Sequence, residues 1–156
     1  MPGLEDFAGR WAIERRIEDA RAAQIVRFTG QAVLRPAAMG GLDYVESGVL
    51  AMPGQRPITA RRRYLWRQAR EAVEIFFDDG RFFHSINPGP RPRARHVCPP
   101  DTYEVGYDFT SWPAWCVVWQ VKGPRKDYRL RSAFTPLGAC TGREGGAEDA
   151  GRMQQE

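Results

Sequence analysis

The chain has 156 residues and a formal net charge of +4, and 42% of its residues are hydrophobic and 12% aromatic. This length suits one domain, and the apolar share supports a packed core, which excludes a wholly disordered chain. The longest apolar runs, such as residues 115–119, fall far short of the roughly 20 residues that a membrane-spanning helix needs, so we predict no membrane span.

The N-terminus, residues 1–11, has neither the basic region nor the apolar region of a secretory signal, which predicts a cytoplasmic protein. Cysteine usage points the same way. Cys98, Cys116 and Cys140 are three in number and widely spaced, which is not a disulfide framework.

Residues 4–8 have the pattern of a short helical turn, and the rest of the chain reads as short strands between turn signals. Glycine and proline pairs mark several of the turns, and no segment between strands is long enough for a crossover helix. We expect strands at residues 9–18, 25–35, 42–50, 58–67, 73–77, 81–86, 95–98, 102–109, 115–123 and 128–134.

These segments predict an all-β protein, an antiparallel up-and-down barrel of about eight to ten strands with a short N-terminal helical turn. Residues 1–136 form this single domain. Residues 137–156 contain five glycines and no aromatic residue, so we expect a disordered tail. An edge of the sheet left open by incomplete closure could support a homodimer, which the sequence does not decide.

The segment 73–86 defines which side chains point inward. Asp79-Gly80 is typical of a two-residue type I′ hairpin turn, which sets Ile75 opposite His84. Alternation along both strands then gives an apolar inner face with one polar member. This face comprises Ile75, Phe77, Phe82, His84 and Ile86, and it leaves Phe76 and Phe83 outside.

The same alternation in the other strands predicts an aromatic lumen that also contains Arg15. An apolar pocket with a few polar groups is the usual form of a small-molecule site. We therefore expect an apolar or amphiphilic ligand whose anionic or hydrogen-bonding head meets Arg62, Tyr64 and His84. The predicted ligand-binding residues are Arg62, Tyr64, His84, Tyr103, Tyr107, Trp119 and Tyr128. The alternative is that these polar groups pair with one another and brace the core.

An enzyme of the lyase, isomerase or hydrolase type, acting on a small apolar substrate in the same lumen, is the main alternative function. Its acid/base candidates would lie at the rim. These rim candidates are His96, Asp101, Lys126 and Asp127. The sequence contains no nucleophile elbow and no glycine-rich phosphate loop, so no catalytic residue is assigned.

Two further functions are weaker. The donors His96, Cys98 and Asp101 are too few for a zinc site, and haem held by His84 or His96 would rest on one histidine, so no metal or cofactor is predicted. Single-stranded nucleic acid could stack on tryptophan and tyrosine, but most aromatic residues fall on the inner face, which makes nucleic acid an unlikely partner.

The segment Phe7-Ala-Gly-Arg-Trp11 resembles the Gly-x-Trp signature of lipocalins and related calycins. That resemblance implies a calycin-like barrel in which an arginine of the last strand, Arg129 or Arg131, packs across Trp11. Calycins carry lipids, pigments, haem or other apolar ligands, and a few are enzymes. The chain lacks the disulfide typical of secreted lipocalins, which argues against extracellular transport.

Four further segments are similar to those of an uncharacterised bacterial domain family. They are residues 62–66, 79–84, 96–103 and 123–128. The resemblance covers most of residues 4–135 and implies the same barrel, without any established activity.

Overall fold

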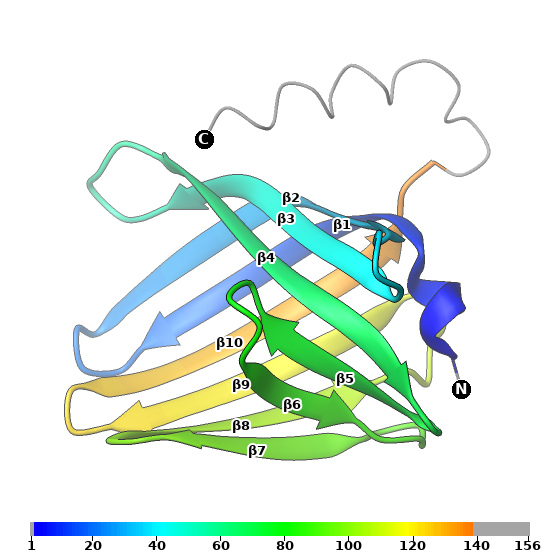
Figure 1. The fold of residues 1–156 in the computed structure, drawn as a ribbon. Coiled ribbons are helices and arrows are strands. Elements are labelled where there is room, and N and C mark those ends of the chain that lie inside the picture. Colours follow the sequence, from blue (N-terminus) through cyan, green and yellow to red (C-terminus); the bar gives the residue numbers. More distant parts are fainter. Residues whose placement is uncertain (1, 139–156) are drawn as a thin grey trace.

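The structure, a computed structural model, describes residues 2–138. Ten antiparallel strands follow one N-terminal 3₁₀ turn and form a nearly closed barrel, which confirms the predicted fold (Figure 1). The elements are η1 (Leu4–Phe7), β1 (Gly9–Asp19), β2 (Gln24–Pro36), β3 (Leu42–Ala51), β4 (Ile58–Ala69), β5 (Ala72–Phe77), β6 (Phe82–Ile86), β7 (Arg93–Cys98), β8 (Asp101–Asp108), β9 (Trp115–Gly123) and β10 (Lys126–Pro136).

The strands form one sheet in the order β6-β5-β4-β3-β2-β1-β10-β9-β8-β7, so β6 and β7 are its edges. No backbone ladder joins these two strands. Aromatic side chains cross the seam between them instead. The ring of Phe83 on β6 lies 5.3 Å from that of His96 on β7, and Phe77 lies 5.9 Å from His96. These contacts bring the two edges together without strand pairing.

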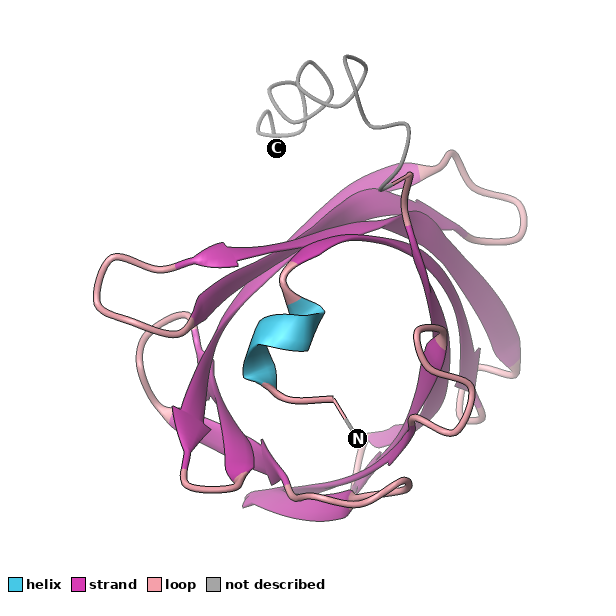
Figure 2. Ribbon diagram, turned by 90° about the vertical axis from the view of Figure 1, so that its right-hand side faces the viewer, coloured by secondary structure: helices cyan, strands magenta, loops and turns pink. Residues whose placement is uncertain are grey.

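The short turn η1 lies across the bore at one end of the barrel (Figure 2). Its last residue, Phe7, is 1% exposed and contacts Trp66, Trp112 and Trp115 with ring centroids 5.1, 5.2 and 5.4 Å away. The Trp11 indole Nε1 donates a hydrogen bond to the Phe7 carbonyl at 2.9 Å. One end of the lumen is therefore closed by aromatic packing.

The arginine implied by the calycin resemblance does not lie on Trp11. In the β1–β10 ladder Trp11 is opposite Pro136, whereas Arg131 is opposite Arg16 and Arg129 is opposite Glu18. Both arginines occupy exposed, outward positions of β10. Trp11 packs instead against the rings of Trp112 and Trp115, with centroid distances of 5.5 and 5.8 Å.

The β5–β6 hairpin differs from the predicted two-residue turn. Phe77 N donates to Arg81 O, Gly80 N donates to Phe77 O, and Gly80 has φ +93°, which defines a three-residue loop with glycine in the left-handed region. Ile75 is opposite His84, as predicted, but a β-bulge follows, and Phe76 is opposite Phe82.

The bulge reverses two of the predicted side-chain orientations. Phe83 lies inside with 7% exposure and Phe82 lies outside with 48% exposure, so the prediction was wrong for both residues. A bulge adds one residue to a strand and so breaks the alternation on which that prediction depended.

Two further expectations concern the C-terminal tail and the predicted lack of a membrane-spanning helix. Residues 139–156, most of the predicted disordered tail, lie outside the described residues. Between residues 2 and 138 no helix is long and apolar enough to cross a membrane.

Candidate functional site

The barrel encloses a cavity of about 330 Å³. Its walls are mostly aromatic and aliphatic, and side chains from β1, β3, β4, β5, β6, β8, β9 and β10 contribute to them. The volume is at the lower end of the range of roughly 300–1,000 Å³ found for small-molecule sites. All seven predicted ligand-binding residues line the cavity, namely Arg62, Tyr64, His84, Tyr103, Tyr107, Trp119 and Tyr128.

A buried ion pair forms one wall. Arg15 Nη1 and Nη2 donate to the two carboxylate oxygens of Glu46 at 2.6 and 3.0 Å, and Arg15 Nε donates to Ser132 Oγ at 2.7 Å. The Tyr44 hydroxyl donates to Glu46 Oε1 at 2.6 Å. The guanidinium of Arg15 thus has its hydrogen-bond partners within the protein. This agrees with the alternative in which polar lumen residues pair with one another.

Glu46 was not among the predicted site residues, although the alternation of residues in its strand indicates an inward position. Leu42, Tyr44 and Glu46 alternate on one face of β3, and all three are buried. Two inward apolar residues at spacing two place the third position inside as well. A buried carboxylate needs a cationic partner, so a contact between Glu46 and the inward Arg15 could then have been expected.

The pair is held in its charged form. Burial opposes ionisation of Glu46, but the hydrogen bond and charge of Arg15 outweigh it and lower the pKa of the carboxyl group. Burial likewise opposes the charge of Arg15, and Glu46 outweighs it and raises the pKa of the guanidinium. Because the two charges cancel, the pair adds no net charge to the lumen.

His84 is held as a neutral imidazole. It is 3% exposed, and its Nε2 lies 2.7 Å from the Tyr107 hydroxyl. Burial, assisted by the nearby His96, lowers the pKa of His84 to about 3. Burial also raises the pKa of Tyr107, so both groups are uncharged at neutral pH. Neither His84 nor Tyr107 therefore offers a positive charge to an anionic head.

Arg62 leaves the lumen wall with one net positive charge. It is opposite Glu46 in the β3–β4 ladder, and its charge helps to lower the pKa of that carboxyl group, but Glu46 is already bonded to Arg15. Arg62 is exposed although it lines the cavity, and within residues 2–138 it forms no ion pair. Its Nη1 lies 3.5 Å from the Tyr64 hydroxyl, at the limit of a hydrogen bond. Because Arg15 and Arg62 share one carboxylate, Arg62 is able to meet an anion that enters the lumen.

Arg62 and His84 lie in different rows of the sheet. Trp66 is opposite Ile75, and Ile75 is opposite His84, so Trp66 and His84 share one row of the sheet. Arg62 precedes Trp66 by four residues, a separation of about 13 Å along a strand. The three residues of the predicted head group site, Arg62, Tyr64 and His84, therefore do not share one row of the sheet.

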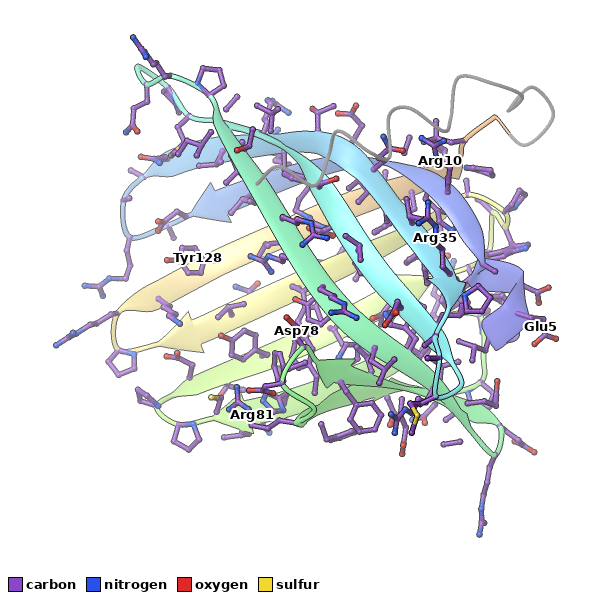
Figure 3. The ribbon with its side chains drawn as sticks, turned by 45° about the horizontal axis from the view of Figure 1, so that its top comes forward. Glu5, Arg10, Arg35, Asp78, Arg81 and Tyr128 are labelled. Carbon is purple, nitrogen blue, oxygen red and sulfur yellow. The ribbon has the colours of Figure 1, made fainter. Side chains whose placement is uncertain are left out.

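Lys126 and Tyr128 line the cavity at the opposite end from η1. Figure 3 shows Tyr128 far from Glu5 of η1. Lys126 Nζ lies 3.0 Å from Asp101 Oδ2, and this hydrogen bond, with the charge of Asp101, raises the pKa of the ammonium group. Lys126 therefore stays protonated at neutral pH and offers no general base.

The remaining rim candidates lie apart from the cavity wall. His96 packs in the seam between β6 and β7, and Asp101 contacts Lys126 without lining the cavity. Asp127 alternates with the inward Lys126 and Tyr128, so it faces the outside of β10. The structure brings Lys126 and Asp101 together but separates them from His96 and Asp127.

The described residues contain no group of three or more His, Cys, Asp and Glu side chains that could hold a metal ion. Of the large hydrophobic residues exposed on residues 2–138, Phe82 is the single aromatic one. The outer face therefore offers little surface on which bases could stack.

Comparison with known proteins gives a family and a fold. One solved structure with the same fold is the S-type phycobiliprotein lyase CPES from Guillardia theta, with a TM-score of 0.61 and 9% sequence identity over 85% of this chain and 89% of that chain. No curated protein matches the sequence. Residues 7–136 match the family described as "Family of unknown function (DUF6314)", and the chain belongs to that family.

Proposed function

We propose that the protein binds a small amphiphilic molecule in its lumen, with an anionic head at Arg62 and an apolar body among the aromatic rings. The observation that carries this proposal is the charge distribution of the cavity. Arg15 is neutralised by Glu46 and Lys126 is paired with Asp101. Arg62 forms no ion pair within residues 2–138, and the carboxylate opposite it, Glu46, is already bonded to Arg15. A net positive charge beside a mostly apolar cavity favours an apolar ligand that carries an anion.

The aromatic residues supply the surface for the apolar body. Phe83 stacks on Trp119 with ring centroids 5.1 Å apart and an interplanar angle of 7°, and Tyr64 stacks on Phe83 at 5.9 Å. Both Trp119 and Phe83 line the cavity. Burial of apolar ligand surface against these rings supplies roughly 25 cal/mol per Å², which favours a flat or chain-like apolar group over a sugar.

An enzyme working in the same lumen remains the second candidate, and the likeness to a phycobiliprotein lyase is the observation that favours it. In that case the neutral pair of His84 and Tyr107 would be the groups able to exchange a proton with a substrate, because Lys126 stays protonated. Turnover of a bound compound would separate this function from binding alone. A homodimer and a cytoplasmic location stay predictions.

The test is calorimetric titration with the carboxylate probe 4′-ethylbiphenyl-4-carboxylate. The wild-type protein is expected to bind one molecule, and Arg62→Met is expected to weaken binding about fivefold, since a partly solvated charged contact is worth about 1 kcal/mol. Arg61→Met is the matched control, because Arg61 neighbours Arg62 on β4 but is absent from the cavity wall. Equal losses in both variants, or no binding to the wild-type protein, would contradict the proposal.

A further inference from the structure

Three of the rings that line the cavity carry a buried nitrogen atom without a hydrogen-bond partner. The nitrogen atoms are Trp66 Nε1, Trp115 Nε1 and His84 Nδ1, and none has a partner within residues 2–138. All three rings line the cavity and are 2–3% exposed. By contrast the indole of Trp11, which does not line the cavity, donates to the Phe7 carbonyl. Buried polar atoms are rarely left unpaired, so three around one cavity call for an explanation.

All three nitrogen atoms are best described as donors. An indole N–H can only donate. For His84 the choice of tautomer follows from the hydrogen bond between its Nε2 and the Tyr107 hydroxyl. If Nε2 carried the hydrogen, it would donate to the Tyr107 oxygen, and both the phenol hydrogen and the Nδ1 lone pair would lack partners. If Nδ1 carries the hydrogen, Tyr107 donates to Nε2 and one group is left over. The second tautomer leaves fewer groups unpaired, and it makes Nδ1–H a third unpaired donor.

These donors lie toward the closed end of the lumen. Trp66 and Trp115 both contact Phe7 of η1, and their own centroids are 6.5 Å apart. His84 shares a sheet row with Trp66 and is connected to Trp115 through the Tyr107 ring, with centroid distances of 5.9 and 6.3 Å. The donors therefore belong to one continuous group of rings, about 13 Å along β4 from Arg62.

We propose that the ligand carries, at the end remote from its anionic head, an uncharged oxygen acceptor such as a ketone, ester or amide carbonyl, which takes a hydrogen bond from at least one of the donors at Trp66, Trp115 and His84. An uncharged acceptor is favoured because the neighbouring Arg15 is already matched by Glu46 and offers no charge for a second anion. The inference rests on the proposed function and narrows the ligand to an oxo-carboxylic acid or a carboxylate with a distal carbonyl.

The test compares 4′-acetylbiphenyl-4-carboxylate with 4′-ethylbiphenyl-4-carboxylate by calorimetry on the wild-type protein. The two probes differ by a carbonyl in place of one methylene at the end away from the carboxylate. We expect the acetyl probe to bind about tenfold more tightly, the effect of one satisfied hydrogen bond in a buried site. Equal affinity, or tighter binding of the ethyl probe, would overturn the inference whatever the variants do.

Variants then identify the donors. Trp66→Phe, Trp115→Phe and His84→Phe each remove one N–H, and we expect the preference for the acetyl probe to fall in at least one of them. Trp11→Phe is the matched control, since its N–H already has an acceptor, and it should keep the full preference. A preference that survives all three cavity variants would contradict the assignment.

The outcome separates this inference from the proposed function. If both carboxylates bind equally and Arg62→Met weakens both, the distal acceptor is wrong and the anionic head stands. If the uncharged compound 4-acetylbiphenyl binds as tightly as the acetyl carboxylate, the donors stand and the anionic head is wrong. If no probe binds, both proposals fail together.

Discussion

Removal of the Glu46 carboxylate tests whether the polar wall of the lumen is a buried ion pair. The side chains of Arg15 and Glu46 are 12% and 4% exposed, and the contact is bidentate. Glu46→Leu leaves the guanidinium without its counter-charge, which costs about 3–5 kcal/mol of unfolding free energy. At roughly 2–4 °C per kcal/mol for a chain of this size, the midpoint of thermal unfolding should fall by about 6–20 °C.

Urea denaturation followed by tryptophan fluorescence gives the unfolding free energy directly. Glu18→Leu is the matched control, because the Arg16–Glu18 pair is 43% and 47% exposed and should lose no more than about 1 kcal/mol. The double variant Arg15→Met with Glu46→Leu should recover most of the loss, since an apolar pair restores the balance. A loss below about 1 kcal/mol for Glu46→Leu would refute the assignment of a buried, charged pair.

Two further predictions concern the bulged strand. Phe83→Ala should cost about 3–4 kcal/mol, whereas Phe82→Ala, on the exposed side, should cost less than about 1 kcal/mol, and similar losses in urea denaturation would argue against the bulged register. The folded pKa of His84 is depressed to about 3 from an ordinary value near 6.5, so the unfolded state binds the proton first and stability falls as the pH drops below about 6.5. Between pH 6.5 and 5 the unfolding free energy should fall by about 1.5 kcal/mol, and His84→Phe should abolish this fall. A variant with the same pH profile as the wild-type protein would contradict a buried neutral imidazole.

The barrel could be predicted because its signals are local. Alternation along the segment 58–67 placed Arg62, Tyr64 and Trp66 on one face, and all three line the cavity. Turn residues located the ends of the strands within a few positions, so the antiparallel order followed from short connections. Predictions of this kind need only the alternation of side chains along a strand and the residue preferences of turns.

The predictions that failed depended on information that is not local. Phe82 and Phe83 changed sides because one extra residue in the strand shifts the alternation, and the Asp79-Gly80 pair is compatible with both hairpin types. The rows of Arg62 and His84 could not be predicted, because the relative placement of two inward residues depends on strand register across the sheet. Arg129 could not be excluded from Trp11 until the β1–β10 ladder was known.

The central claim is that the lumen holds a ligand, and native mass spectrometry of the protein purified from its own host tests it most directly. Leu130 lines the cavity and is half-buried, so Leu130→Trp should fill the lumen, while Arg131→Trp adds the same side chain to the outer face of β10. We predict a reproducible additional mass on the wild-type protein and on Arg131→Trp that Leu130→Trp loses. A bare polypeptide mass for the wild-type protein, or an additional mass that Leu130→Trp retains, would contradict the account.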